Sequence, residues 1–442
     1  MIALLPEILS AASILGVGAF VASCVTTSKP DAPTLAQIIA DAPVQLRAAV
    51  SVLADPLQTN LMLQALGLGC PESGFPPLES YVYTRHGIEA DFLMLAGQSR
   101  KKWSNEDTRD AFAQVLAVPK VTVSLPAPGV VRLQLRVFDT LAAPAALPGG
   151  VSNEVDLEAV PAGLTEDGDG VRIPVLYTHG LGAGLTGSGK GSIIWSLVAG
   201  LAPAIRSGLV DLWGIDPKGG VEFSPGRELF VRFAYQSAED ILALLEEAVT
   251  VMRERQAALM KAKLRKHIPT TDEPLILLLI DEFAALSAYA EPKVKARLDE
   301  LLGLLLTQAR ATAISVFAFI QDPSKENMPQ RQLFPLRMGL RLAEPTQIAM
   351  VFGAGARDRG AECDEISYTT PGVGYIEQDG SRELTRVRFY LVTDDDIARL
   401  VAQVAPRHEI ISPATHSDDE ESFDPSTFDP DDLGDGEGSV AA

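Results

Sequence analysis

The sequence predicts an α/β protein in which a mainly parallel sheet follows a small α+β domain and an N-terminal transmembrane helix. Three observations support this prediction. From about residue 160 onward, short and almost wholly apolar runs alternate with helical patterns, as in strands buried on both faces of a parallel sheet. Before residue 148 the strand-like runs alternate apolar and polar residues instead, and near the N-terminus a stretch of 18 residues has no charge. At 442 residues, 47% of them hydrophobic, the chain can form two or three packed domains.

The uncharged stretch runs from Ile8 to Val25, at the short end of what crosses a bilayer. Residues 1–30 are therefore predicted to be a membrane anchor. A secretory or lipoprotein leader, suggested by "VASC", and a buried core helix stay open as alternatives, although Glu7 stands where a leader carries basic residues. The first positive charges, Lys29 and Arg47, follow the stretch. This order predicts a single-pass protein of the cell membrane with its bulk in the cytoplasm.

Residues 35–148 are predicted to form an accessory α+β domain. Two segments place alternate apolar residues on one face of a strand: Ile88, Ala90, Phe92 and Met94 in the first, and Val131, Leu133, Leu135 and Val137 in the second. Between them, Ser104 with Asp107 three residues later indicates the N-cap of a short helix. The Pro- and Gly-containing run 143–150 marks the end of this domain.

The formal net charge of −21 is unevenly distributed. Between Asp418 and Glu437 there are ten acidic residues and no Lys or Arg, so that this segment contributes −10 and leaves −11 for the rest of the chain. Residues 406–442 are predicted to be an acidic disordered tail, because they bury too little apolar surface to offset the entropy of ordering. The total charge argues against a protein that coats nucleic acid by net charge, but it permits a locally basic surface. The three cysteines form neither a metal-binding motif nor a disulfide framework.

Residues 184–192, "GLTGSGKGS", come close to the phosphate-binding pattern G-x-x-x-x-G-K-S/T, but Gly191 stands where a hydroxyl residue is expected. A strand-like segment precedes this loop and a helical one follows it. Glycines let backbone N–H groups turn toward phosphate oxygens, and the helix N-terminus adds its positive end. The loop predicts a site for ATP with Mg²⁺, in which Lys190 reaches the β- and γ-phosphates. The predicted nucleotide-binding residues are Gly184, Leu185, Thr186, Gly187, Ser188, Gly189, Lys190, Gly191 and Ser192.

Polar residues also follow three of the apolar runs. "PLILLLI" ends in Asp281 and Glu282, "ISVFAFI" ends in Gln321, and "LVDLWGI" ends in "DPKGG", residues 216–220. Carboxylates at the end of a buried strand are costly unless a charged group requires them. In P-loop NTPases an Asp at this place holds Mg²⁺ and an adjacent residue orients the attacking water. The ends of these strands are expected at the sheet edge where open α/β sheets bind ligands.

These motifs, together with "GIDPKGGVEF", "QARATAISVFAFIQDPS" and "ARDRGAECDEI", resemble the motor domain of FtsK/SpoIIIE-type DNA translocases. They are most similar to the actinobacterial conjugative-transfer branch, the TraB/TraSA-like proteins. The resemblance covers residues 160–405. It implies a RecA-like P-loop ATPase motor that assembles as a homo-hexamer around double-stranded DNA, with ATP between the subunits.

Carried over by position, the resemblance assigns a role to each motif residue. Asp281 would hold Mg²⁺, Glu282 would be the catalytic base and Gln321 the γ-phosphate sensor. Ser192 or a water molecule would replace the hydroxyl that is missing at Gly191, or the metal would depend more strongly on Asp281. A ring also needs an arginine from the neighbouring subunit, because the transition state spreads negative charge over the transferred phosphoryl group. The candidates for this arginine are Arg310, Arg357 and Arg359.

The resulting prediction is an ATP-driven double-stranded DNA translocase for conjugative or mobile-element DNA transfer, acting as a membrane-associated ring. Its expected partners are duplex DNA, further copies of the chain, the membrane and other transfer proteins. Two alternatives stay open. The first is a coupling-protein ATPase that pumps single-stranded DNA, and the second is a nucleotide-binding scaffold that does not hydrolyse ATP.

Overall fold

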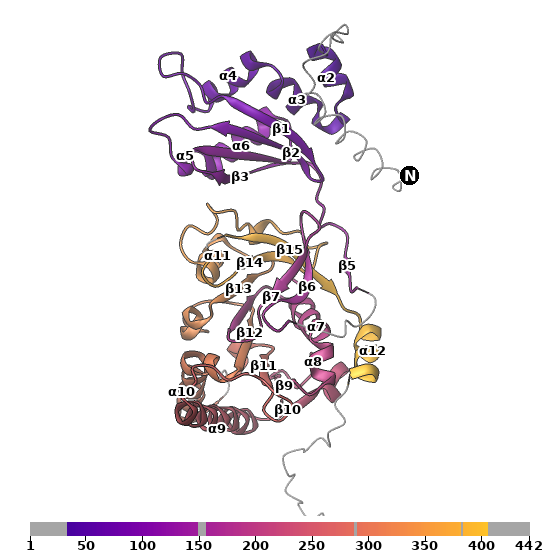
Figure 1. Ribbon diagram of the computed structural model, residues 1–442, viewed down its shortest axis with the longest axis vertical. Coiled ribbons are helices and arrows are strands. Elements are labelled where there is room, and N and C mark those ends of the chain that lie inside the picture. Colours follow the sequence, from indigo (N-terminus) through magenta and orange to yellow (C-terminus); the bar gives the residue numbers. More distant parts are fainter. Residues whose placement is uncertain (1–32, 149–155, 287–289, 382, 405–442) are drawn as a thin grey trace, which may run out of the picture.

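The computed structural model describes residues 33–148, 156–286, 290–381 and 383–404. Figure 1 shows a smaller N-terminal part above a larger α/β part. We call the larger part the motor part, after the motor domain predicted for residues 160–405. The predicted anchor (residues 1–30) and the predicted acidic tail (residues 406–442) lie outside the described residues. Among the residues that the structure does describe, no helix is both long and apolar enough to cross a membrane.

The N-terminal part is an antiparallel sheet of four strands in the order β1-β2-β4-β3, packed with short helices. The strands are β1 (Leu78–Thr84), β2 (Gly87–Leu93), β3 (Lys120–Ala127) and β4 (Val130–Arg136). The helices are α2 (Leu35–Asp41), η1 (Val44–Leu46), α3 (Arg47–Leu53), α4 (Pro56–Ala65), α5 (Arg100–Ser104) and α6 (Glu106–Val115).

The alternating pattern of the sequence places the core of this part. On β2, Ile88, Ala90 and Phe92 are fully buried, and the alternate residues of β4 are buried likewise, as predicted. The expectation of a helix N-cap at Ser104 is wrong. Ser104 ends α5, which buries Trp103, and Asn105 caps α6 instead by accepting a hydrogen bond from the Asp107 N–H at 2.8 Å. Asn is as good an N-cap as Ser, so the sequence pattern alone did not distinguish them.

The motor part is one mixed sheet in the order β10-β9-β11-β12-β8-β13-β14-β15-β6-β7, with β5 added beside β15. Its strands are β5 (Ala145–Ala146), β6 (Val160–Thr165), β7 (Gly170–Ile173), β8 (Gly180–Ala183), β9 (Val210–Ile215), β10 (Phe230–Ala234), β11 (Leu275–Ile280), β12 (Ile314–Ile320), β13 (Leu336–Gly339), β14 (Val373–Glu377) and β15 (Thr385–Leu391). The α-helices are α7 (Lys190–Gly200), α8 (Ala202–Arg206), α9 (Ala238–Ala262), α10 (Pro292–Gln308), α11 (Pro345–Phe352) and α12 (Asp394–Val404). Short 3₁₀ segments are η2 (Ser224–Leu229), η3 (Phe283–Leu286), η4 (Arg310–Thr312), η5 (Pro329–Leu333) and η6 (Cys363–Glu365).

The apolar strands lie at the centre of this sheet, as the sequence predicts. All six residues of β11 and all seven of β12 are buried. Along β11, Ile276 and Leu278 face a core with α9 and α10, whereas Leu277 and Leu279 face a core with α7 and α8, because successive side chains of a strand point to opposite faces. The glycines of the neighbouring strand β8 make room for the aromatic rings of β12.

The strands from β10 to β13 are parallel, and those from β13 to β7 pair antiparallel. The sequence predicts the parallel half. The antiparallel extension was not anticipated, because β14, β15, β6 and β7 come from both ends of the motor segment and meet only when the chain folds.

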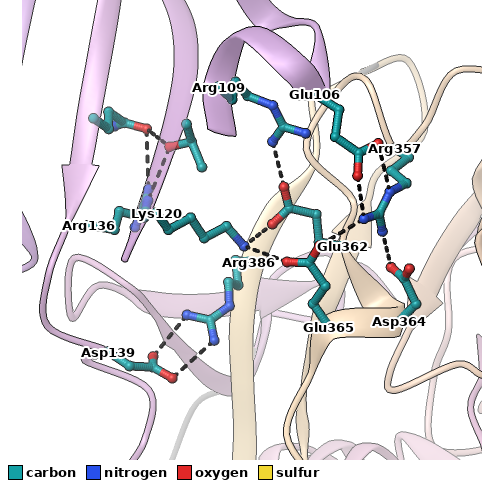
Figure 2. A network of polar contacts seen from close by, with 12 residues as sticks. Glu106, Arg109, Lys120, Arg136, Asp139, Arg357, Glu362, Asp364, Glu365 and Arg386 are labelled. Carbon is teal, nitrogen blue, oxygen red and sulfur yellow. Dashed lines mark hydrogen bonds and ion pairs between the residues drawn. The ribbon is translucent and has the colours of Figure 1, made fainter. Parts of the chain in front are cut away.

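A network of ion pairs joins the two parts (Figure 2). Arg109 of α6 and Lys120 of β3 both contact the carboxylate of Glu362, whose side chain is 5% exposed. On the other side of the interface, Arg386 of β15 binds Asp139 at 2.9 Å, and Arg136 of β4 pairs with a carboxylate of the β6–β7 turn. The N-terminal part is thus held to the motor part by the buried Arg109–Glu362 pair and by pairs such as Arg386–Asp139 that are partly exposed.

Candidate nucleotide site

Four parallel strands, β9, β11, β12 and β8, end at one edge of the motor sheet and bring the predicted motifs together. The glycine-rich loop follows β8, Asp281 and Glu282 follow β11, Gln321 follows β12, and the turn 216–220 follows β9. The loops are joined directly, since the Thr186 hydroxyl donates a hydrogen bond to Gln321 Oε1 at 3.0 Å. The sequence rule that parallel strands present their carboxyl ends at a common edge therefore holds here.

The glycine-rich loop is built from backbone hydrogen bonds and left-handed glycines. The Gly184 N–H donates to the Ile320 carbonyl of β12 at 3.0 Å, and the Leu185 N–H donates to the Arg341 carbonyl at 2.9 Å. Gly187 and Gly189 have φ of 73° and 97°, values that favour glycine. A Cβ at Gly187 would meet no atom within 4 Å, so the loop leaves open space at that point. Gly189 is the N-cap of α7 and directs the positive end of that helix to the same edge.

Lys190 and Ser188 provide the side chains of the loop. The Lys190 ammonium donates to the Gly184 carbonyl at 2.9 Å and so closes the loop on itself. Burial lowers the pKa of Lys190, while Glu282 and Asp281 oppose that shift. The Ser188 hydroxyl is buried and has no hydrogen-bond partner among the described residues. A loop with an open backbone turn, an adjacent ammonium and an unpaired buried hydroxyl can accept phosphate oxygens.

Asp281 and Glu282 are almost fully buried, at 6% and 5% exposed. The Lys218 ammonium lies 3.1 Å from Glu282 Oε2 and 3.9 Å from Asp281 Oδ2, and the other Glu282 oxygen accepts the Gln321 N–H at 3.2 Å. Burial raises the pKa of Asp281 to about 6, although Lys218 opposes this shift. Lys218 of "DPKGG" thereby gains a role that sequence reasoning left open, as the counter-ion of the carboxylate pair.

Two further carboxylates, Asp216 and Glu222, lie at the same edge. Asp216 is fully buried, and its two oxygens accept the N–H groups of Lys218 at 3.1 Å and Glu222 at 2.9 Å. Burial first, then repulsion by Asp281 and Asp216, raises the pKa of Glu222 to about 7. Sequence reasoning did not single out Glu222. Its place in "DPKGGVEF", six residues after Asp216, was the available signal.

The structure places Gly191 and Ser192 in different surroundings. Gly191 lies under the Glu222 carboxylate. The Ser192 hydroxyl faces Gly372, where an added Cβ would lie 3.4 Å from it. Gly372 itself donates its N–H to the Ser188 carbonyl at 2.8 Å, and a Cβ at Gly189 would lie 2.3 Å from the Gly372 nitrogen. The segment before β14 thus supports the glycine-rich loop, a contact that sequence reasoning did not find.

The three candidate arginines lie away from this edge. Arg357 binds Glu106 of α6 at 2.8 Å and also pairs with Asp364 and Glu365, so that it belongs to the interface between the two parts (Figure 2). Arg310 precedes β12 and therefore lies at the sheet edge opposite the glycine-rich loop. It lines a hollow of about 780 Å³ together with Arg337 and Arg359.

The exposure of these arginines differs. Arg310 is 49% exposed and lies 3.6 Å from Asp379, whereas Arg359 is 22% exposed and binds Glu377 at 2.9 Å. Neither the Arg310–Asp379 pair nor the Arg359–Glu377 pair lies at the sheet edge that carries the glycine-rich loop. In a single chain, then, the structure does not bring any of the three predicted arginines to the glycine-rich loop.

The donors gathered at this edge fit a magnesium nucleotide. Mg²⁺ prefers oxygen ligands, of which carboxylates are the usual protein source, and leaves several positions to phosphate and water. Four carboxylates, Asp216, Glu222, Asp281 and Glu282, stand here with the ammonium groups of Lys190 and Lys218, and the Arg341 guanidinium donates to the Thr186 carbonyl of the loop at 3.3 Å. The fold is thus an α/β sheet that carries a phosphate-binding loop and acidic residues at the carboxyl edge of its parallel strands.

Comparison with known proteins confirms the resemblance seen in the sequence. Residues 150–274 match the model of the FtsK/SpoIIIE family, a segment that includes the glycine-rich loop and "DPKGGVEF" and ends before Asp281. The chain is 28% identical over 345 residues to "Transfer protein TraSA" of Streptomyces ambofaciens, an alignment that covers 72% of this chain and 79% of that protein.

Two solved structures are similar to this one. The first is the monomer form of the pCW3 conjugation coupling protein TcpA with ATPγS, at a TM-score of 0.52 and 18% identity, covering 78% of this chain and 97% of that chain. The second is the cytoplasmic domain of the type VII secretion ATPase EccC of Thermomonospora curvata, at a TM-score of 0.48 and 22% identity. This match covers 61% of this chain and 34% of that chain. The similarity to TcpA confirms the α/β fold.

Proposed function

We propose that this protein is an ATP-driven translocase of double-stranded DNA that serves conjugative or mobile-element transfer. The observation that carries the proposal is the meeting of the glycine-rich loop with Asp281, Glu282 and Gln321 at one sheet edge, within a chain similar to a transfer protein. An ATPase needs a phosphate cradle, a metal-binding carboxylate and a group that orients water, and this edge supplies a residue for each.

In this proposal each residue has a distinct task. Lys190 releases the Gly184 carbonyl and binds phosphate oxygens. Asp281 would hold Mg²⁺, which when bound neutralises charge on the β- and γ-phosphates. Glu282 accepts the proton of the attacking water once Lys218 no longer neutralises it, and Gln321 positions that water.

A ring would complete the site. We propose that copies of the chain assemble, as the resemblance implies, into a homo-hexamer around duplex DNA. A neighbouring subunit would then supply an arginine to stabilise the transferred phosphoryl group. Arg310 and Arg359 border the hollow at the opposite sheet edge, and Arg310 is the more exposed of the two. Arg357, which three carboxylates hold at the domain interface, would have to leave that network first.

The N-terminal stretch supports a further part of the proposal, membrane association. Ile8 to Val25 carries no charge, and basic residues follow it. We propose that residues 1–30 anchor the ring at the cell membrane with the motor part in the cytoplasm, next to other transfer proteins.

The test is ATP hydrolysis by the full chain without DNA, with duplex DNA and with single-stranded DNA, alongside the Glu282→Ala variant. We expect duplex DNA to raise the rate and Glu282→Ala to lower it about 10²-fold or more, since it removes the general base. Stimulation by single strands alone would instead favour a coupling-protein ATPase. If the native chain hydrolyses ATP no faster than Glu282→Ala in any of the three conditions, the protein is a nucleotide-binding scaffold and the translocase proposal is abandoned.

A further inference from the structure

We propose that the Glu222 carboxylate supplies the metal-facing oxygen that the glycine-rich loop lacks at Gly191. The inference rests on the proposed function, because it concerns the Mg²⁺ that accompanies ATP. It answers the question that the sequence leaves open, namely what replaces the expected hydroxyl, and it assigns the role to a residue 31 positions further along the chain.

The first argument is the space at Gly191. A Cβ built on Gly191 would lie 2.5 Å from Glu222 Oε1 and 3.5 Å from Glu222 Cδ. No side chain can begin at that distance from a carboxylate oxygen without displacing it. The Glu222 carboxylate therefore fills the space into which a serine or threonine at position 191 would project. Glycine at this position and glutamate at position 222 form one complementary pair.

The second argument is that the fold delivers Glu222 to this place. The Glu222 N–H is held by Asp216, which is fully buried at the end of β9. Between them the chain turns through Gly219 and Gly220, with φ of 84° and 78°. On the far side, Phe223 is fully buried and packs on Phe230, with ring centroids 5.0 Å apart. The backbone on both sides of Glu222 is thus fixed, and it starts the Glu222 side chain beside Gly191.

The third argument is the charge around Glu222. Asp281 and Asp216 repel its carboxylate, and Lys190 attracts it. Asp281 is the residue that would hold Mg²⁺, so Glu222 already shares the electrostatic surroundings of the metal. A divalent cation between these carboxylates would relieve their repulsion. Exchanging a hydroxyl for a carboxylate keeps an oxygen ligand for Mg²⁺, bound directly or through a water molecule, and adds a negative charge.

Ser192, the residue that the sequence suggests for this role, is less well placed. Its hydroxyl faces Gly372 on the segment before β14. Its N–H donates to the Gly189 carbonyl at 3.0 Å in the first turn of α7, so that only a change of side-chain rotamer could turn the hydroxyl away from Gly372. A carboxylate already directed at the helix start requires no such rearrangement.

The test is the affinity of the ADP-bound full chain for Mn²⁺, measured by electron paramagnetic resonance. We expect Glu222→Ala to weaken Mn²⁺ at least about tenfold, as for loss of a metal-site ligand or its partner. Gly191→Ser should also weaken it, because the new side chain collides with the carboxylate. The double variant Gly191→Ser/Glu222→Ala should recover most of the affinity, because the hydroxyl then occupies the vacated space. Glu228→Ala, an exposed carboxylate on the following turn, is the matched control and should bind Mn²⁺ as the native chain does.

The outcomes separate this inference from the proposed function. Recovery in the double variant supports the complementary pair. Native Mn²⁺ affinity in Glu222→Ala, or a double variant as weak as Glu222→Ala, overturns it while leaving nucleotide binding in place. A native chain that binds neither ADP in EDTA nor Mn²⁺ with ADP would instead overturn the proposed function. Should Glu222→Ala fail to fold, Glu222→Gln keeps the shape of the side chain. It should lower Mn²⁺ affinity several-fold, and native affinity in that variant overturns the inference.

Discussion

Replacing Arg109 by Met should weaken the attachment of the N-terminal part to the motor part. The side chains of Arg109 and Glu362 are 6% and 5% exposed, so that neither charge is well solvated. Removing one partner of such a pair leaves an uncompensated buried charge, at a cost of about 3–5 kcal/mol. Lys120 still contacts the Glu362 carboxylate after the change. We therefore expect the lower end of that range, about 3 kcal/mol.

A double-mutant cycle isolates the pair. Glu362→Gln alone strands the Arg109 guanidinium, whereas the double variant removes both charges, so that the effects should be non-additive by about 2 kcal/mol. The assay is urea unfolding of the full chain followed by tryptophan fluorescence. Trp103 reports on the N-terminal part because it stacks on Phe112 of α6, the helix that carries Arg109, whereas Trp195 and Trp213 report on the motor part.

The matched control is Glu106→Gln at the rim of the same network. Glu106 is 45% exposed, and solvated pairs contribute only about 0.2–1 kcal/mol. Equal effects of Arg109→Met and Glu106→Gln, or strictly additive effects within the cycle, would refute the reasoning that burial makes the Arg109–Glu362 pair the stronger contact.

Three further changes have defined outcomes. Burial lowers the pKa of His179 from 6.5 to about 3, so that only the unfolded chain takes up a proton at this residue as the pH falls below 6.5, and the folded state loses stability. His179→Asn keeps an acceptor for the Val316 N–H and should remove about 2 kcal/mol of the stability loss between pH 7 and pH 5. Urea unfolding at both pH values measures this, and identical pH profiles of the native chain and the variant would contradict it. Gly189→Ala should lower nucleotide affinity in fluorescence titrations at least about tenfold through strain and collision with Gly372, whereas Gly208→Ala, with φ of 77° and open space, should cost about 1 kcal/mol of stability and no affinity. Gln321→Ala should slow ATP hydrolysis about 10²-fold with unchanged nucleotide affinity, and a parallel loss of affinity would show a structural role instead.

Much of the candidate site could be read from the sequence because its signals are local. Buried parallel strands are apolar along their whole length, and β9, β11 and β12 lie where such runs occur. The residue that ends a strand is then at the edge of the sheet whatever surrounds it. For this reason Lys190, Asp281, Glu282 and Gln321 could be placed near one another without coordinates.

Contacts between distant segments could not be predicted in this way. Arg109 and Glu362 are 253 positions apart, and no sequence pattern around either residue predicts that they pair. Arg357 shows the consequence. "GARDRGA" suggests an available arginine, but Asp364 and Glu365 of η6 pair with it, and docking of α6 adds Glu106.

The sequence by itself thus determined which motif follows which strand, because hydrophobic periodicity and the residue at a strand end are both encoded within a few positions. Only the tertiary structure decided how Gly191 is compensated, which loop supports Gly189, and which arginines are engaged. All three depend on contacts between residues that are far apart in the sequence. The Glu222 carboxylate, for example, fills the space beside Gly191, and no local sequence pattern predicts this contact.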